Sequence, residues 1–156
     1  VGDGLHLVLT RRQAHLRGHS GQISFPGGRQ DEDDHDFIAT ALRETCEELG
    51  LCETTHIEVL GMLNKVYIPP SNHDVYPVVG IMTHKPQWQP NPNEVAEVFS
   101  LALHELLNPD IKRITQREFR GRTFDVPYYY VQGHEVWGAT AAVLSELEGR
   151  LDSVLL

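Results

Sequence analysis

Hydrophobic and polar positions follow two different periods along this chain, and the changes of period mark out its elements. Stretches with alternating or short continuous apolar residues, bounded by turn-forming residues, are typical of β-strands. Such stretches are Leu5–Thr10, Gln22–Phe25, Ile57–Val66, Val75–Thr83 and Val95–Leu101. Apolar residues also alternate on both sides of Gly121, which predicts a β-hairpin over Arg117–Tyr130.

Other segments carry apolar residues at helical spacing. The first helix is predicted over Phe37–Leu49, with Asp34 or Asp36 as its N-cap and Gly50 as the residue that ends it. The second is predicted over Ala139–Leu151. Its expected core positions are Val143, Leu144, Leu147 and Leu151. Strands mixed with helices in this way predict the α/β class, with a sheet packed between helices.

The chain has the size of one domain, because 156 residues suffice for a single hydrophobic core. Its 40% apolar and 22% charged residues are ordinary for a soluble globular protein. The segment Gly2–Gly4 predicts a hairpin turn, but a single residue precedes it. We therefore interpret residues 1–156 as one domain whose N-terminal strand is missing from this sequence.

Net charge limits the partners of the chain. The formal charge is −9, which argues against nucleic acid as a partner because phosphate binding demands a basic surface. No apolar run reaches about 18 residues, so no membrane span is predicted. Asp31–Asp36 holds five acidic residues in six, which fits a solvated loop or a segment that attracts cations.

The two cysteines argue for a reducing compartment. Cys46 falls inside the first predicted helix and Cys52 just beyond its end, so a bridge between them would distort the helix terminus. We therefore expect no disulfide and a cytoplasmic location.

Carboxylates cluster on the first predicted helix. Residues at i, i+3 and i+4 share a helix face, so Glu44, Glu47 and Glu48 converge. Like charges at this spacing repel one another, and a divalent cation would remove the conflict. Carboxylate oxygens suit hard cations such as Mg²⁺ or Mn²⁺. The upstream pair Gly27 and Gly28 would let the backbone approach a ligand closely.

The spacing of these residues resembles the Nudix box, the signature motif of the Nudix hydrolases. The matching residues are Gly28, Arg43, Glu44, Glu47, Glu48, Gly50 and Leu51. The segment between Gly28 and Arg43 is one residue longer than the family pattern, so the first acidic position of the box falls on Asp34 or His35. Thr45 also replaces an aliphatic residue, although its β-branched side chain is close in shape to Val.

The segment before the box resembles a second signature, which marks the coenzyme A diphosphatase branch of the Nudix hydrolases. The matching residues are Leu9, Thr10, Arg12, Arg17, Gly21, Phe25, Pro26, Gly27 and Gly28. Gln13 stands at a Ser or Ala position of that signature, and Val8 at a Leu position. Segments 75–80 and 136–141 are also similar to later parts of this branch, so the resemblance extends over nearly the whole chain.

The resemblance implies an α/β/α sandwich with a mixed β-sheet and a hydrolase that depends on Mg²⁺ or Mn²⁺. It implies that Glu44, Glu47 and Glu48 are the metal ligands. Arg43 lies one helical turn before Glu47, so an ion pair between them would orient that carboxylate.

Nudix enzymes often supply a further glutamate from a region just before an apolar strand. Glu94 and Glu97 occupy such a region here, and we expect Glu97 to act as metal ligand or general base. Glu44 is the rival base, because its position in the box has that role in some relatives. Sequence leaves this choice open.

Basic residues near the second signature are the expected phosphate-binding groups. Arg12 and Arg17 carry guanidinium groups that match phosphate geometry, and the amides of Gly27 and Gly28 could assist them. The 3′-phosphate of coenzyme A would need another cation. The residues left open for it are Lys65, Arg113 and Arg117.

These features predict a metal-dependent enzyme that hydrolyses the diphosphate bond of coenzyme A and its derivatives. The expected products are 3′,5′-ADP and 4′-phosphopantetheine or its acyl form. One alternative is a Nudix hydrolase of another nucleoside diphosphate compound, such as ADP-ribose or NADH. The other is a non-catalytic nucleotide sensor. The oligomeric state stays open, with a homodimer among the options.

Overall fold

The computed structural model describes residues 4–17, 21–53 and 56–155. Its strands are β1 (His6–Arg12), β2 (Ile23–Ser24), β3 (Glu58–Met62), β4 (Val66–Ile68), β5 (His73–Val75), β6 (Val78–Ile81), β7 (Val95–Ala102), β8 (Lys112–Phe119), β9 (Arg122–Val131) and β10 (His134–Val136). Its helices are α1 (Phe37–Leu49), α2 (Leu103–Leu106) and α3 (Gly138–Leu155), with a short 3₁₀ turn, η2 (Pro109–Ile111). The turn predicted over Gly2–Gly4 lies mostly outside the described residues.

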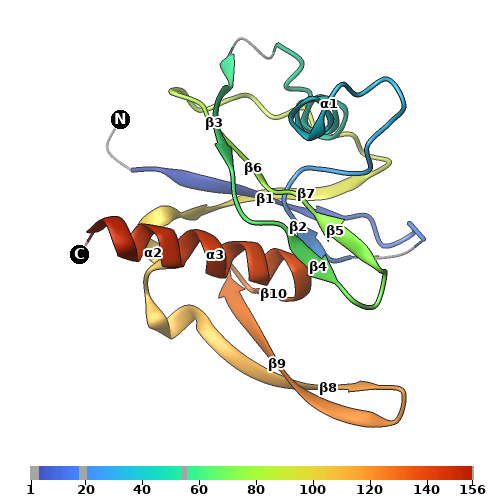
Figure 1. Cartoon of the computed structure of the whole chain (residues 1–156), viewed down its shortest axis with the longest axis vertical. Coiled ribbons are helices and arrows are strands. Elements are labelled where there is room, and N and C mark those ends of the chain that lie inside the picture. The colour runs from blue at the N-terminus through green and yellow to red at the C-terminus, as the bar shows by residue number, and fades with distance from the viewer. Residues whose placement is uncertain (1–3, 18–20, 54–55, 156) are drawn as a thin grey trace.

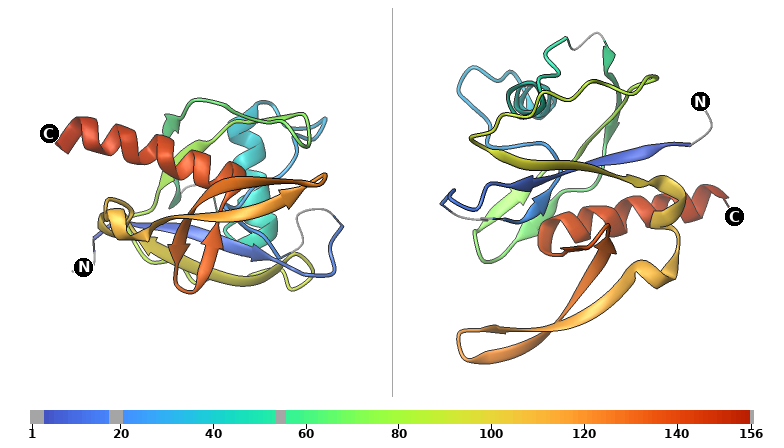
Figure 2. Two further views of the ribbon diagram at one scale, coloured as in Figure 1. Left: turned by 90° about the horizontal axis from the view of Figure 1, so that it is seen from below. Right: turned by 180° about the vertical axis from the view of Figure 1, so that it is seen from behind.

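Most of the strands lie between two helices, with α1 on one side and α3 on the other, whereas β8 and β9 lie beyond α3 (Figure 1). Two three-stranded sheets have the orders β2–β1–β7 and β10–β9–β8, and two further ladders pair β3 with β6 and β4 with β5. Every pairing among the described strands is antiparallel. The view from behind shows the same layering (Figure 2, right). The sandwich of helices and strands predicted from the sequence is confirmed, and its described ladders are antiparallel where we expected a mixed sheet.

The main core lies between the β1–β2–β7 sheet, the root of β9 and helix α3. Its buried members are Leu9, Ile23, Phe99, Leu101, Leu106, Tyr129, Val131, Val136, Ala141 and Leu144. Of the positions predicted for α3, Val143 and Leu144 are buried, and Leu147 and Leu151 pack against the core while partly exposed. In the described part of the chain, no helix is both long and apolar enough to cross a membrane.

Two predicted strands are interrupted in the structure. The stretch Val75–Thr83 divides into β5 and β6 because Pro77 has no backbone N–H to donate to a ladder. The stretch Ile57–Val66 ends its ladder at Met62, and its register with β6 shifts near Gly61, whose φ is 149°. Both breaks turn the chain from the β3–β6 ladder into the separate β4–β5 hairpin.

The β8–β9 hairpin projects from the body of the molecule (Figures 1 and 2). Its root is held to α3, because the Tyr129 hydroxyl donates to Glu148 at 2.9 Å and Lys112 Nζ lies 2.5 Å from the same carboxylate. Between residues 112 and 128, no side chain is buried. The hairpin is therefore longer than the predicted Arg117–Tyr130, and it presents both of its faces to solvent or to the neighbouring cleft.

Candidate functional site

Helix α1 carries the predicted carboxylates, and local signals fix both of its ends. The Asp36 side chain accepts a hydrogen bond from the amide of Ala39 at 2.7 Å, so Asp36 is the N-cap. Gly50 adopts the left-handed conformation with φ of 74°, and its amide donates to Cys46 O at 2.8 Å. The prediction of a helix over Phe37–Leu49 is confirmed residue for residue.

Arg43 is the centre of the polar contacts along α1. Its Nε and Nη2 donate to the two oxygens of Asp34, each at 2.9 Å. Its Nη1 lies 3.2 Å from Glu44 Oε1 and 3.1 Å from Glu47 Oε2. Its Nη2 also donates to the carbonyl of Arg29 at 2.8 Å. Arg43 therefore ties the loop before α1 to the helix, and the pair predicted between Arg43 and Glu47 is present.

Asp34 is a residue whose part sequence reasoning missed. The hydrogen bonds from Arg43, followed by one from the Asp31 backbone, hold the pKa of Asp34 well below its usual range. Its side chain is only 6% exposed, so this is an internal ion pair. Counting forward along the Nudix box from Gly28 falls on Asp34, and that was the available signal. Asp34 orients the arginine of the box and does not join the glutamates.

The pair Gly27 and Gly28 lies directly against two of the helix carboxylates. A Cβ added to Gly28 would come within 2.2 Å of Glu44 Oε1, so glycine is required for this approach. The backbone N–H of Gly27 donates a hydrogen bond to Glu48. The glycine turn therefore fixes where Glu44 and Glu48 lie relative to the strand that precedes it.

These two carboxylates are held in a poorly solvated position. Burial, joined by repulsion from Glu44, raises the pKa of Glu48 to about 7. Burial also raises the pKa of Glu44, against the opposing attraction of Arg43. Glu47 differs, because its side chain is half exposed and its carboxylate faces Arg43. Of the predicted metal ligands, the structure brings Glu44 and Glu48 together and leaves Glu47 at the rim.

The further carboxylate that lies near these two is Glu94. Residues 89–95 pack against the end of α1, where the amides of Gln89 and Asn91 donate to Leu49 O and Glu48 O, both at 2.9 Å. The negative charge of Glu94 accordingly contributes to the raised pKa values of both Glu44 and Glu48.

The preferred residue of the sequence analysis, Glu97, is engaged elsewhere. Its carboxylate lies 3.2 Å from Arg11 and 3.2 Å from His134. Burial opposes ionisation of Glu97, but the hydrogen bonds from Arg11 and His134 prevail and lower its pKa. The register of the β1–β7 ladder explains the difference, because Arg11 pairs with Glu97 while the register shifts at Arg12.

The donor set of Glu44, Glu48 and Glu94 fits a hard divalent cation. All of its ligands are carboxylate oxygens, and their charges raise one another's pKa values. Glu94 Oε2 is buried and lacks a hydrogen-bond partner among the described residues. Within the described ranges, no group of three or more His, Cys, Asp or Glu side chains is already gathered for a metal ion. The chemistry of the set therefore fits a cation, although the side chains are not preassembled around one.

One wide cleft of about 3100 Å³ connects the predicted phosphate-binding residues to these carboxylates. The predicted site residues that line it are Arg12, Arg17, Gly27, Gly28, Glu44 and Glu48. Glu94 lines it as well, whereas Arg43, Glu47 and Glu97 do not. The structure thus brings most of the predicted substrate and metal groups to one surface.

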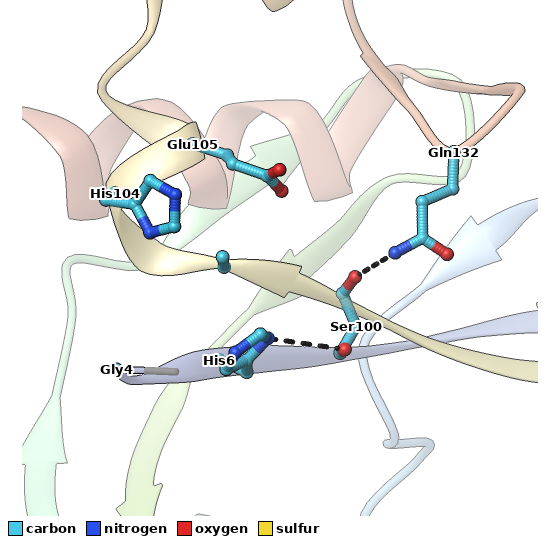
Figure 3. A pocket seen from close by; sticks show the side chains of 7 residues that line it. Gly4, His6, Ser100, His104, Glu105 and Gln132 are labelled. Carbon is cyan, nitrogen blue, oxygen red and sulfur yellow. Dashed lines mark hydrogen bonds between the residues drawn. The ribbon is translucent and has the colours of Figure 1, made fainter. Parts of the chain in front are cut away.

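A smaller pocket of about 610 Å³ lies at the opposite end of the β1–β7 pair (Figure 3). Ser100 Oγ and His6 Nδ1 are 3.4 Å apart there, and Gln132 donates to Ser100 O at 2.6 Å. His104 and Glu105 complete its polar lining. None of the residues predicted for catalysis or binding lines this pocket.

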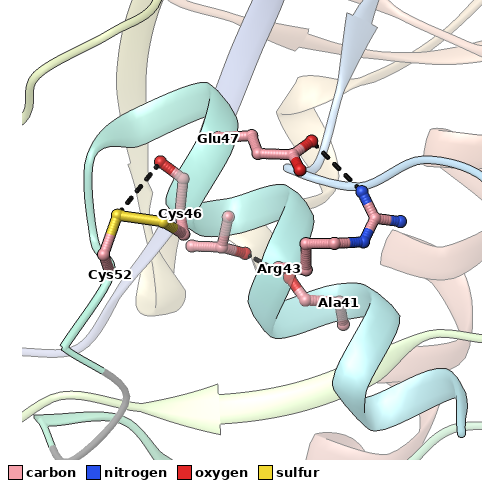
Figure 4. The surroundings of a disulfide bond; sticks show 6 residues. Ala41, Arg43, Cys46, Glu47 and Cys52 are labelled. Atoms are coloured by element: carbon pink, nitrogen blue, oxygen red, sulfur yellow. Dashed lines mark hydrogen bonds and ion pairs between the residues drawn. A yellow bond between two sulfur atoms is a disulfide. The ribbon is translucent and has the colours of Figure 1, made fainter. Parts of the chain in front are cut away.

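Cys46 and Cys52 form a disulfide, so the expectation of no bridge is wrong (Figure 4). The expected distortion of the helix does not arise, because α1 ends at Leu49 and the left-handed Gly50 turns the chain back. Their Cα atoms are consequently 4.3 Å apart. The cysteine pattern therefore no longer supports a reducing compartment.

The comparisons with known proteins agree with the predicted motif. The NUDIX domain family matches residues 2–122. The uncharacterized Nudix hydrolase NudL of Photorhabdus laumondii is 38% identical over 90% of this chain and 74% of its own length. The protein of the same name from Pectobacterium atrosepticum is 40% identical over 90% of this chain and 72% of its own. The mitochondrial Nudix hydrolase 15 of Arabidopsis thaliana is 38% identical over 92% of this chain and 51% of its own length.

Among solved structures, the MutT protein of Methanosarcina mazei Go1 is similar with a TM-score of 0.57 and 18% identity. The match covers 93% of this chain and 83% of that one, and it supports the fold alone. The family match and the sequence identities to the bacterial relatives show family membership in addition to the fold. The chain belongs to the Nudix hydrolases, a family that acts on nucleoside diphosphate derivatives.

Proposed function

We propose that this protein is a metal-dependent diphosphatase of coenzyme A and its derivatives. The observation that carries the proposal is the shared cleft. Arg12, Arg17 and the Gly27–Gly28 pair belong to the segment that resembles the coenzyme A signature, and they line the same cleft as Glu44 and Glu48. The residues that would recognise the substrate and those that would hold the metal therefore line one continuous cleft.

The metal ligands in this proposal are Glu44, Glu48 and Glu94, with Glu47 able to join them from the rim. When bound, Mg²⁺ or Mn²⁺ supplies charge neutralisation at the phosphate oxygens and makes bound water more acidic. Arg43 binds the Glu47 carboxylate, and Asp34 in turn orients the Arg43 side chain. The amide of Gly27 holds Glu48, so both carboxylates are positioned before substrate enters.

The reaction itself is a hydrolysis of one phosphoanhydride bond. A water oxygen adds to one phosphorus atom, the bridging P–O bond breaks, and the proton of the water is taken up by a carboxylate. The leaving phosphate carries away the bridging oxygen, which gives 3′,5′-ADP and 4′-phosphopantetheine. The work of the protein is mainly positional and electrostatic. Arg12 and Arg17 would orient the diphosphate through their guanidinium groups.

We assign the carboxylate that assists this step from outside α1 to Glu94 in place of Glu97. Glu94 lines the cleft and carries a buried oxygen that lacks a hydrogen-bond partner among the described residues. Glu97 is bonded to Arg11 and His134, and these hydrogen bonds lower its pKa. A carboxylate with a lowered pKa and two partners is a weak base and a weak metal ligand. Glu44 remains the other candidate base, because it lines the cleft beside Glu94.

A substrate panel tests this proposal. The purified protein is assayed with Mg²⁺ and with Mn²⁺ against coenzyme A, acetyl-coenzyme A, ADP-ribose and NADH, and the products are identified by mass spectrometry. The proposal predicts the largest kcat/KM for a coenzyme A compound, with 3′,5′-ADP as a product. A larger kcat/KM for ADP-ribose or NADH would reject it. Absence of turnover with every compound, together with binding of nucleotides, would instead indicate a sensor.

A variant distinguishes the assigned site from other surfaces. Glu48→Gln removes the charge and keeps the shape of the side chain, so the fold should be retained in circular dichroism. We expect kcat to fall by about 10² or more, the range found when a group that acts on the transition state is removed. Glu53→Gln is the matched control, because Glu53 is exposed beyond the helix end. Unchanged turnover in Glu48→Gln would show that the active site lies elsewhere on the protein.

A further inference from the structure

Buried polar atoms without partners gather in the cleft. Among the described residues, the buried side-chain nitrogen and oxygen atoms that have no hydrogen-bond partner belong to Arg12, Glu94 and Arg117. All of these residues line the same cleft. A buried donor or acceptor without a partner is costly, so each favours a ligand that satisfies it. The carboxylate oxygen favours a cation, whereas the two guanidinium Nε atoms favour anions.

Arg117 comes from a different part of the fold than Arg12. Arg12 ends strand β1, and its charge acts on Glu48, so it belongs to the carboxylate end of the cleft. Arg117 lies on strand β8 of the projecting hairpin, opposite Phe124, and both side chains line the cleft. Besides Arg12, Arg17, Arg29 and Lys85, the cleft therefore has a cationic group on the hairpin that the proposed cleavage of the diphosphate does not use.

The Arg117 guanidinium is held in a fixed orientation. It lies 4.4 Å from the ring centre of Trp137, and its Nη2 donates to Glu135 at 2.8 Å. These contacts leave Nε, and with it part of the planar donor array, without a partner. Preorganised donors of this kind bind a phosphate with little loss of side-chain freedom. The carboxylate of Glu135 is the nearest charge that would oppose an incoming anion.

The other cations that the sequence left open for this task have contacts of the same kinds as Arg117, but they do not line the cleft. Lys65 Nζ lies 3.1 Å from Asp74, and Lys65 does not line the cleft. The Arg113 guanidinium stacks on Tyr130 at 4.2 Å from the ring centre, and Arg113 does not line the cleft either. The structure therefore separates Arg117 from the two alternatives.

The local charge of the hairpin also favours an anionic ligand. The hairpin residues 112–131 contain five Lys or Arg residues and two acidic residues, in a chain whose formal charge is −9. The hairpin is thus a basic element on an acidic protein, and of its charged residues Arg117 and Glu118 line the cleft. A field of this sign attracts a ligand with several negative charges.

We propose that Arg117 forms a subsite for a phosphate monoester on the ribose of the substrate, separate from the diphosphate that is cleaved. In coenzyme A this group is the 3′-phosphate, so the inference rests on the proposed function and deepens it. Arg117 is a specificity-determining residue in this scheme. It binds the substrate through a group that takes no part in bond breaking.

The test is a double-perturbation cycle, in which the 3′-phosphate is removed from the substrate and the guanidinium from the protein, separately and together. We measure kcat/KM for coenzyme A and for its 3′-dephospho form with the unaltered protein, Arg117→Ala and Arg117→Lys. The readout is the ratio of the two kcat/KM values within each preparation, so partial misfolding cancels. We expect Arg117→Ala to lower this ratio by about tenfold or more, as for a lost hydrogen bond to a charged group. Arg117→Lys should give an intermediate ratio, because lysine keeps the positive charge and lacks the planar set of guanidinium N–H donors.

Arg113→Ala is the matched control, since it removes an arginine from the same strand that does not line the cleft. It should keep the ratio of the unaltered protein. Two results would overturn the inference: an unchanged ratio in Arg117→Ala, or an unaltered protein that does not distinguish the two substrates.

Binding by calorimetry separates this inference from the proposed function. The unaltered protein should bind adenosine 3′,5′-bisphosphate about tenfold or more tightly than 5′-AMP, and Arg117→Ala should remove that preference. This comparison requires no turnover, so it still decides the inference if coenzyme A proves not to be the substrate. Inorganic phosphate is titrated as well. If it competes as strongly as the bisphosphate, Arg117 is a general anion site and the ribose-phosphate assignment is wrong.

Discussion

Replacing Glu48 by Gln should stabilise the metal-free protein at alkaline pH, although the same change should remove activity. The Glu48 side chain is buried, with 6% of the residue exposed. Its charged form is therefore poorly solvated and also repelled by Glu44. Glutamine has nearly the same shape, carries no charge and can still accept the hydrogen bond from Gly27. The substitution thus removes an unfavourable charge without opening a cavity.

The size of the effect follows from the pKa of Glu48, which rises from 4.5 to about 7 on folding. Each tenfold change in proton affinity corresponds to about 1.4 kcal/mol, so the difference amounts to roughly 3 kcal/mol. The sign of the effect on stability follows from the direction of the pKa shift. Because the folded protein binds the proton more tightly than the unfolded chain, this contribution is fully present below about pH 4.5. It is lost as the pH rises through 7, where the folded protein must carry the charge.

Urea unfolding with a chelator and without reductant, at pH 5 and at pH 8, measures this effect. The free energy of unfolding of Glu48→Gln should be close to that of the unaltered protein at pH 5 and exceed it by up to about 3 kcal/mol at pH 8. Glu47→Gln is the control, since its half-exposed side chain should leave the pH dependence in place. Adding Mg²⁺ at pH 8 should stabilise the unaltered protein more than Glu48→Gln. A Glu48→Gln protein that is less stable than the unaltered protein at pH 8 would refute the reasoning.

Three further predictions concern other parts of the site. Gly28→Ala places a Cβ against a glutamate carboxylate of α1, which should lower kcat by about 10² while the unfolding temperature changes little, as steady-state kinetics and thermal melts would show. Glu94→Gln should lower kcat by about 10², whereas Glu97→Gln should alter it by less than about threefold; the reverse order would restore the sequence-based preference. Reduction of the Cys46–Cys52 bond should lower the free energy of unfolding by about 2 kcal/mol, measured by denaturation with and without a dithiol, because the bond closes a loop across six positions.

Local signals allowed helix α1 to be predicted with its true bounds. An aspartate at the cap, apolar residues at helical spacing and a glycine at the end act within a few residues of one another. The strands broken by Pro77 and near Gly61 were predicted as continuous, because apolar alternation persists through both breaks. The apolar pattern indicates which side chains face the core. It does not indicate where a strand lacks a backbone N–H donor or where the register of a ladder shifts.

The choice between Glu94 and Glu97, both of which the sequence offered, depends on long-range contacts. Glu94 lies near the helix carboxylates because residues 89–95 bond to the end of α1, and no short motif encodes that contact. The preference for Glu97 failed to anticipate its pairing with Arg11, which follows from the β1–β7 register. The disulfide also depended on a tertiary detail, since the left-handed Gly50 reverses the chain. The pair of Arg43 and Glu47 within one helix was predictable, whereas pairs between distant segments were not.

The central claim is that Glu44, Glu48 and Glu94 together hold a divalent cation in the cleft. A crystal grown with Mn²⁺ and measured for anomalous scattering at the manganese edge tests it most directly. We predict one strong anomalous peak with oxygens of Glu44 and Glu48 at about 2.0–2.2 Å and Glu94 bound directly or through water. A peak on Glu47 or Glu97 alone, or a saturated crystal with no peak in the cleft, would contradict the account.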